Sequence, residues 1–320
     1  FEPILWTDFD LKREHVSFND ASFKAALIRN LAHIRIIGTW TADETLFRVL
    51  TQGSTTDPGR LCNNLKQFRL RDADYEHLDE TSEYVATLLD LNHRLTDLEL
   101  PLEFFMNEAV QTSVSKLNDL QRLTITALRQ CEGNRAISAL LRACLPLPNL
   151  TELVIDLDLI WDDTKHAIAA LTTLIKEASI ARFSRHPGAT KIKSLHLPDN
   201  RHGRQNPLPL LLLKSNLLDL EKCEIPWFGP STDVSKLTDV VRKYCPNLKD
   251  LTFGSGEEGS HGMCAFIRGC SGLRRFSSLE FSDDLDSEPR GILATLASQH
   301  SDTLEDLNLI LCHQAYSRDQ

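Results

Sequence analysis

The sequence lacks a long apolar run and an excess of basic residues. Its longest apolar stretch, residues 208–213, is interrupted by Pro209 and falls far short of the about 20 residues that cross a bilayer. Thirty-five Lys and Arg against 45 Asp and Glu give a net charge of −10, whereas general binding to nucleic acid needs clustered cations. We therefore expect neither a membrane nor a nucleic acid as the partner.

The sequence also lacks the cysteine patterns of disulfide scaffolds and zinc ribbons. Eight cysteines in 320 residues are sparse, and no Cys-x-x-Cys pair occurs. Cys62, Cys245 and Cys270 each stand just before a leucine-rich run, where a buried, reduced thiol acts as a small apolar side chain. Disulfides or a reactive thiol are the alternative. We expect a cytoplasmic or nuclear protein with reduced cysteines.

The motifs of common catalytic and cofactor sites are missing as well. There is no His-Glu-x-x-His and no Gly-x-Ser-x-Gly. Residues 254–259 match Gly-x-Gly-x-x-Gly, but two glutamates within the match would place negative charge beside a pyrophosphate, so we interpret it as a turn. Asp283, Asp284 and Asp286 form an acidic turn without the offsets of an EF-hand loop. We expect a protein that is not an enzyme and that holds no metal and no cofactor.

What the sequence does have is one short repeated pattern: apolar, two variable, apolar, one variable, apolar. Successive copies begin 31, 30, 25, 30 and 42 residues apart, and then four times 28 residues apart. The copies begin at Ile34, Leu65, Leu95, Leu120, Leu150, Ile192, Leu220, Leu248, Phe276 and Leu304. The long step after Leu150 is interpreted as a surface insertion with a helix at residues 164–180; a lid or partner-docking loop is the alternative.

Each copy predicts a short strand whose apolar positions turn inward, and the segments between copies have helical spacing. Helices are predicted at residues 76–91 and 232–244, and another is expected to begin near Pro289. A strand and a helix every 20–29 residues are typical of leucine-rich repeats, which bury their apolar faces by stacking. The predicted fold class is therefore α/β: a leucine-rich-repeat solenoid, a ribonuclease-inhibitor-like horseshoe with parallel strands inside and helices outside. A doubly wound α/β fold is the alternative, but it does not require this pattern.

No linker divides the chain, so we expect a single leucine-rich-repeat domain over residues 1–320. Residues 1–30 are interpreted as an N-terminal capping segment, and about ten repeats are expected from residue 31 to residue 320.

Two features resemble a known family. The copies preceded by Cys62 and Cys245 resemble the cysteine-containing leucine-rich repeats of F-box proteins, in the irregular style of fungal F-box-like families. Residues 1–6, Phe-Glu-Pro-Ile-Leu-Trp, are similar to the Pro-x-Leu-Trp segment that follows an F-box in that family. The resemblance implies the substrate-recognition domain of an SCF ubiquitin-ligase adaptor. Binding to the SCF adaptor subunit is expected only if an F-box precedes Phe1. The alternative is a stand-alone scaffold or regulator with no ubiquitin role.

The third and fifth positions of each copy alternate with the buried positions and should face the concave surface. Seven of these residues are acidic and three are basic, and the last three copies contribute no base. Our hypothesis is that this face attracts a basic segment of a protein partner; the alternative is a solvated polar surface. The candidate partner-binding residues on it are Glu152, Lys222, Glu224, Asp250, Glu280 and Asp306.

Aromatic residues follow several predicted strands and should gather on one rim of the array. Rigid aromatic rings often dominate protein interfaces, so Trp161, Trp227 and Phe228 are further candidates for partner binding. Phe104 and Phe105 belong to the same set. The alternative is that such rings fill the loop layer of the solenoid.

Overall fold

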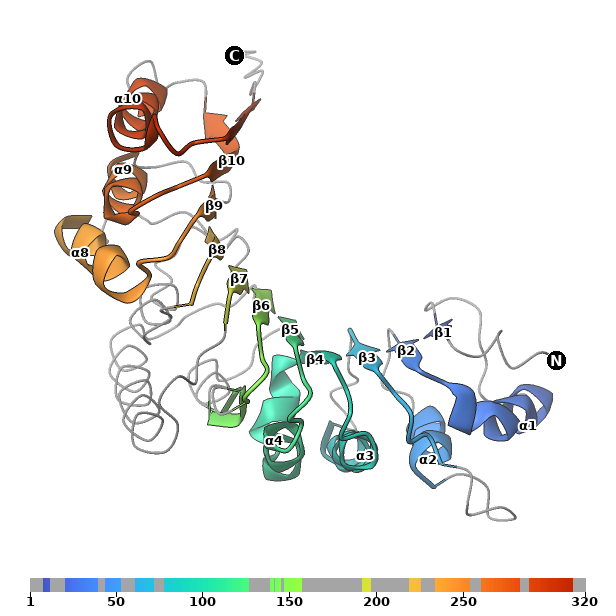
Figure 1. The fold of residues 1–320 in the computed structure, drawn as a ribbon. Helices are drawn as coiled ribbons and strands as arrows, with labels where there is room; N and C mark the ends of the chain where they lie inside the picture. Colours follow the sequence, from blue (N-terminus) through green and yellow to red (C-terminus); the bar gives the residue numbers. More distant parts are fainter. Residues whose placement is uncertain are drawn as a thin grey trace, which may run out of the picture. The chain divides into compact units, whose positions relative to one another are not determined.

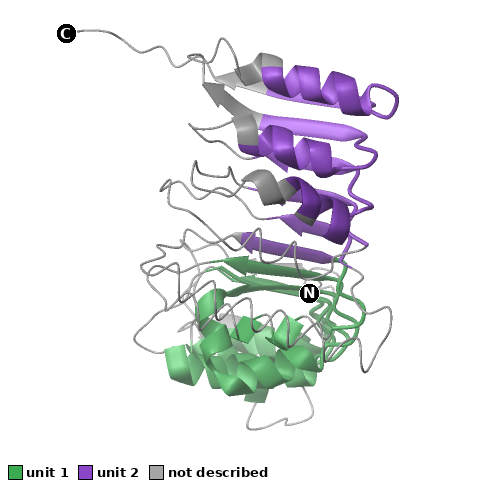
Figure 2. Cartoon of the chain, turned by 90° about the vertical axis from the view of Figure 1, so that its left-hand side faces the viewer, with its two compact units in different colours: residues 1–151 green, residues 152–320 purple. Residues whose placement is uncertain are grey.

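The structure of the chain is a computed structural model that forms two compact units, residues 1–151 and residues 152–320 (Figure 2). It describes residues 8–11, 21–39, 44–52, 61–71, 78–126, 139–140, 142–144, 147–156, 192–196, 219–225, 234–253, 260–282 and 288–312. Each unit is built from parallel strands joined by helical segments, and the units are described separately below.

In unit 1, residues 1–151, five described strands pair in parallel in chain order, and the helices lie along one side of the strand row (Figure 1). The strands are β1 (Asp8–Leu11), β2 (Ile36–Thr39), β3 (Gln67–Leu70), β4 (Asp97–Pro101) and β5 (Arg122–Thr126). The helices are α1 (Ala21–Asn30), η2 (Leu31–His33), α2 (Glu44–Gln52), α3 (Leu78–Leu91), η4 (Leu102–Met106) and α4 (Glu108–Ser115).

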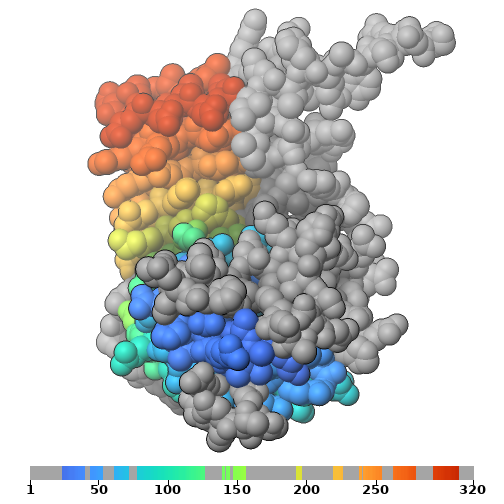
Figure 3. Space-filling view, turned by 90° about the vertical axis from the view of Figure 1, so that its right-hand side faces the viewer, coloured from blue at the N-terminus to red at the C-terminus, as the bar shows by residue number. Residues whose placement is uncertain are grey.

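In unit 2, residues 152–320, six described strands also pair in parallel in chain order. The strands are β6 (Glu152–Asp156), β7 (Ser194–His196), β8 (Lys222–Ile225), β9 (Asp250–Phe253), β10 (Arg275–Ser282) and β11 (Asp306–Cys312). The helices are α8 (Val234–Tyr244), α9 (Ser260–Gly269) and α10 (Glu288–His300). The C-terminal repeats lie as successive layers in chain order (Figure 3).

The alternation of apolar and variable positions in the repeat pattern matches the alternation of buried and half-buried side chains. In the copy at β3, Leu65, Phe68 and Leu70 are buried, while Gln67 and Arg69 between them are half-buried. The predicted helices are confirmed as α3 and α8, and Pro289 is the second residue of α10. Parallel strands covered by helices on one face therefore follow from the apolar positions of the sequence.

Side chains near the start of a repeat hydrogen-bond to the main chain of the repeat before it. Asn92 stands three residues before Leu95, where other copies have cysteine, and is buried. Its Oδ1 accepts from the Leu65 amide at 2.8 Å, and its Nδ2 donates to the Cys62 carbonyl at 2.7 Å. The buried side chain thus satisfies polar main-chain groups that the apolar core would otherwise leave unpaired.

His300 plays the same part at the last described repeat. The Leu273 amide donates to its Nδ1 at 3.3 Å, and its Nε2 lies 3.0 Å from the Ile267 carbonyl oxygen. With these partners the ring accepts at Nδ1 and donates at Nε2. Threonine hydroxyls add to the same backward pattern. Thr96 donates to the Lys66 carbonyl, Thr151 to the Gln121 carbonyl and Thr303 to the Leu273 carbonyl.

The copy predicted to begin at Phe276 begins instead at Leu273. Phe276 pairs with Leu251 and Ser278 pairs with Phe253, so Ser278 occupies the third core position. Leu273, Phe276 and Ser278 are all buried. The spacing from Leu248 is therefore 25 residues, and that to Leu304 is 31 residues, so the expectation of four equal spacings was wrong.

The segment interpreted as an N-terminal cap contains a strand in the register of the repeats. In β1, Phe9 pairs with Ile37 and Leu11 pairs with Thr39. The predicted helix at residues 164–180, the glycine-rich turn at 254–259 and the acidic turn at 283–286 lie outside the described residues. Across the part of the chain that is described, no helix has the length and apolar character needed to cross a membrane.

Gly269, the last residue of α9, allows this helix to approach α8 closely. A Cβ at this position would lie 2.7 Å from Val241 Cβ and 2.8 Å from the Thr238 carbonyl oxygen, whereas a Cβ at Gly272 meets no atom within 4 Å. We expect Gly269→Ala to lower the free energy of unfolding by about 1–3 kcal/mol, because the two helices must separate. Chemical denaturation of both alanine variants measures this. A loss for Gly269→Ala no larger than that for Gly272→Ala would contradict the close approach.

The described cysteines are all buried and free: Cys62, Cys144, Cys223, Cys245, Cys264 and Cys270. Burial raises the pKa of the Cys62 and Cys245 thiols to about 12 each. At pH 8 about 1 in 10,000 of these thiols is ionised, so we expect iodoacetamide to leave them unmodified in the native protein. Mass spectrometry of peptides alkylated before and after denaturation measures this. Native labelling of Cys62 or Cys245 at the rate of a small free thiol would refute it.

Candidate functional site

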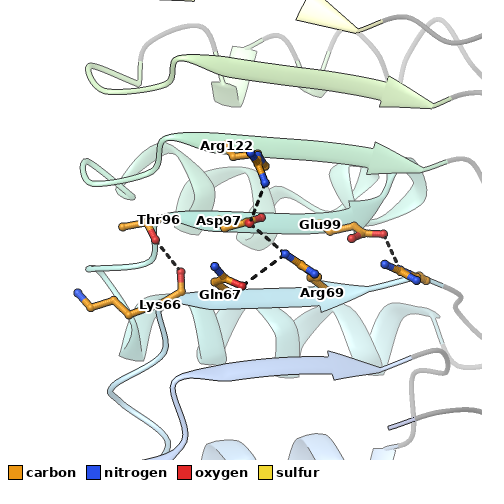
Figure 4. A network of polar contacts seen from close by, with 8 residues as sticks. Lys66, Gln67, Arg69, Thr96, Asp97, Glu99 and Arg122 are labelled. Carbon is orange, nitrogen blue, oxygen red and sulfur yellow. Dashed lines mark hydrogen bonds and ion pairs between the residues drawn. The ribbon is translucent and has the colours of Figure 1, made fainter. Parts of the chain in front are cut away.

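The polar side of the strands in unit 1 carries a compact network of charged side chains (Figure 4). Asp97 on β4 lies between two arginines, with Arg69 Nη2 at 3.3 Å and Arg122 Nη1 at 3.7 Å from its Oδ2. Arg71 Nε lies 3.0 Å from Glu99 Oε1. Both carboxylates of β4 are thus paired with arginines, and Asp8 and Asp10 hold the corresponding register positions on β1.

The polar side of the strands in unit 2 holds a different arrangement of charged groups. We call it the unit-2 strand face. It consists of Glu152, Val154, Ser194, His196, Lys222, Glu224, Asp250, Thr252, Arg275, Ser277, Asp306 and Asn308. Four of these residues are carboxylates and two are cations, so the face has an acidic surplus.

Two carboxylates of the unit-2 strand face lie around His196, which is on β7 between β6 and β8. His196 Nδ1 lies 2.9 Å from Glu224 Oε2 on β8, and its Nε2 lies 3.9 Å from Glu152 Oε1 on β6. On its own strand, Ser194 Oγ lies 2.9 Å from His196 Nε2. The imidazole is 18% exposed and each glutamate side chain is more exposed, so a partner can reach the cluster.

The hydrogen bond with His196 lowers the pKa of Glu224 below its ordinary value, although partial burial opposes the shift. The charge of Lys222, on the same strand, acts in the same direction. Glu224 therefore stays ionised at neutral pH and below it, so it supplies a lasting negative charge.

Toward the C-terminus the unit-2 strand face alternates in sign. The strand residues Lys222, Asp250, Arg275 and Asp306 occupy equivalent positions on β8 to β11. Arg275 Nε lies 3.6 Å from Asp250 Oδ1, and Asp306 is exposed on β11. The carboxylate of Asp250 is thus partly compensated by its neighbour.

Arg275 corrects the expectation that the last three repeats carry no basic residue. Because that copy begins at Leu273, the positions that face the polar side are Arg275 and Ser277, and not Ser278 and Glu280. Glu280 lies where the pairing of β10 with β11 shifts register, between Ser278 and Phe281, and its side chain is outside the described part. It therefore does not continue the row that contains Asp250. The signal that could have found Arg275 is Cys270-x-x-Leu273, which repeats the Cys-x-x-Leu junction seen at Cys245.

Of the aromatic residues expected on one rim, Phe104 and Phe105 are fully buried in η4. They pack inside the loop layer and are not interface anchors. Trp161, Trp227 and Phe228 lie outside the described residues. Within the described ranges, no group of three His, Cys, Asp or Glu side chains is arranged to hold a metal ion.

No model of a known protein family matches the chain, and no curated protein matches it. Among solved structures, the leucine-rich repeat-containing protein LegL7 from Legionella pneumophila is similar, with a TM-score of 0.51 and 11% identity. That match covers 92% of this chain and 91% of LegL7. The yeast Rad7 and Elc1 complex gives a TM-score of 0.33 and 12% identity, and the match covers 95% of this chain and 87% of the other. The likeness to LegL7 shows the fold alone. Together with the parallel strands and helices of both units, it confirms the predicted α/β leucine-rich-repeat solenoid.

Proposed function

We propose that the chain is a protein-binding module and that the unit-2 strand face holds a partner with a basic segment. The observation that carries this proposal is the pair Glu152 and Glu224, two carboxylates that converge on one imidazole. In unit 1, by contrast, Asp97 and Glu99 pair with arginines of the same face. Opposite potentials steer and orient association, so the carboxylates of the unit-2 strand face fit a basic segment.

Within this role, we propose that the chain is the substrate-recognition domain of an F-box-like SCF adaptor. The support is the resemblance of the Cys-x-x-Leu junctions at Cys62 and Cys245 and of residues 1–6 to that family; Cys270 adds a third junction of this kind. In this role the repeats act by holding a target protein in the cytoplasm or nucleus. A stand-alone scaffold without a ubiquitin connection is the alternative.

The proposed role is binding and not catalysis, although Ser194, His196 and Glu224 follow one another in the order nucleophile, base and acid. Both links of this chain are 2.9 Å long. A hydrolase also needs donors that stabilise an oxyanion. Ser194 lies within the parallel sheet and pairs with Glu152 on one side and with Lys222 on the other. The backbone amides there donate to the hydrogen bonds between strands and do not serve as oxyanion donors.

We therefore expect a fluorophosphonate probe to leave Ser194 unmodified. The reagent reports serines whose oxygen is activated and whose adduct is stabilised by oxyanion donors. Intact-mass analysis of the wild type and of Ser194→Ala measures the result. Stoichiometric labelling that is lost in Ser194→Ala would contradict a binding-only role and would establish an activated serine.

The binding role itself is tested by affinity purification of the full-length natural protein from its own cells, followed by mass spectrometry. One variant combines Glu152→Lys, Glu224→Lys and Asp250→Lys on the unit-2 strand face. Its matched control combines Asp219→Lys, Asp239→Lys and Asp302→Lys at exposed positions away from that face, with the same change in net charge. We expect a basic target protein to co-purify with the wild type and the control in stoichiometric amounts, and to fall at least tenfold with the first variant.

Adaptor and cullin subunits that co-purify with all three proteins would support the ligase role. Their absence, with the basic target retained, would favour the stand-alone scaffold. If both triple variants lose or keep the same proteins, the unit-2 strand face is not the binding surface.

A further inference from the structure

We infer that Glu152, His196 and Glu224 form a proton-controlled docking point for one lysine or arginine side chain of the partner. The inference rests on the proposed function, because it specifies how the unit-2 strand face would hold a basic segment and when it would release it. Its basis is the geometry of three side chains on three adjacent strands, β6, β7 and β8.

The neutral imidazole has a partner at each nitrogen. With its proton on Nδ1, His196 donates to Glu224 Oε2 at 2.9 Å, and Nε2 accepts from the Ser194 hydroxyl at the same distance. A carboxylate can accept about four hydrogen bonds, so Glu224 keeps capacity for another donor. In this state the cluster carries two negative charges around a neutral ring, which is the arrangement that attracts a cation.

Protonation of the ring changes the charge of the cluster without moving the strands. The second proton lies on Nε2, on the side of Ser194 and of Glu152 Oε1, which is 3.9 Å away. The imidazolium then supplies the positive charge that a partner's lysine or arginine would otherwise supply. Because the proton and the partner's cation compete for the same two carboxylates, docking weakens as the pH falls.

Several charged side chains surround His196 on the neighbouring strands. Histidine is the side chain whose ordinary titration falls between pH 5 and pH 8. The described groups that face it are Glu152 from β6 and Glu224 and Lys222 from β8, and Lys222 lies opposite Ser194. Beyond them, Asp250 on β9 pairs with Arg275. The lowered pKa of Glu224 keeps this carboxylate ionised between pH 6 and pH 8, so the switch resides in the imidazole.

The experiment measures the binding of fluorescein-labelled hexa-arginine by anisotropy at pH 6, 7 and 8 and at constant low ionic strength. Displacement of one proton changes an affinity by up to tenfold per pH unit, so we expect the wild-type Kd to rise about tenfold from pH 8 to pH 6. His196→Gln and His196→Asn should show less than a twofold change of Kd between pH 8 and pH 6. His93→Gln, at an exposed histidine of unit 1, should keep the full pH response.

Further variants separate this inference from the proposed function. Glu224→Gln should weaken the peptide at pH 8 by more than threefold, whereas Asp239→Asn on α8, with the same change in charge, should not. If His196→Gln and His196→Asn keep the wild-type pH response while Glu224→Gln still weakens binding, the proton control is wrong and the acidic docking face stands. If Glu152→Gln and Glu224→Gln bind like Asp239→Asn, both the docking point and the basic-segment proposal are overturned.

Discussion

Burial of the apolar positions by neighbouring repeats is the constraint on which the rest of each unit depends. A single strand and helix cannot bury Leu65, Phe68 and Leu70 on its own, so each repeat is stable only when another stacks in register beside it. That register brings equivalent residues of successive repeats to adjacent strands. Because side chains alternate along a strand, the apolar positions of a repeat also determine which of its residues face the polar side.

The polar rows that result behave differently in the two units. In unit 1, arginines on neighbouring strands neutralise Asp97 and Glu99, and such a network holds its own side chains in place. In unit 2, two glutamates meet a histidine whose charge depends on pH. The same scaffold therefore places an arginine–carboxylate network on the strands of one unit and a carboxylate–histidine cluster on the strands of the other.

The strand positions of most repeats could be predicted from sequence because three apolar residues recur at fixed offsets. The register at β10 could not be predicted from that pattern, since Phe276, Leu279 and Phe281 fill all three apolar positions, whereas the observed set has Ser278 at the third. Pairing with β9 and β11 decides between the two, and such pairing is a contact between distant segments. The strand β1 was not predicted either. Residues 6–11 match the apolar pattern, but they lie before Ile34, where the first copy was expected to begin.

The candidate site could be predicted only in part. The sequence indicates which residues face the polar side, and it therefore points to Glu152 and Glu224. It does not indicate that the His196 ring lies between them. His196 and Glu224 are 28 residues apart in the chain, and their contact depends on the rotamer of the His196 side chain. In the sequence, His196 is one polar position among many.

Many of the side-chain hydrogen bonds that cross between repeats run backward along the chain. Asn92, Thr96, Thr151, His300 and Thr303 all reach back to the main chain of the repeat before their own. Removing a repeat from the C-terminal side therefore takes away side-chain partners of main-chain groups in the repeat before it, and water must replace them. A shortened array accordingly loses hydrogen bonds as well as apolar contacts at its new C-terminal end.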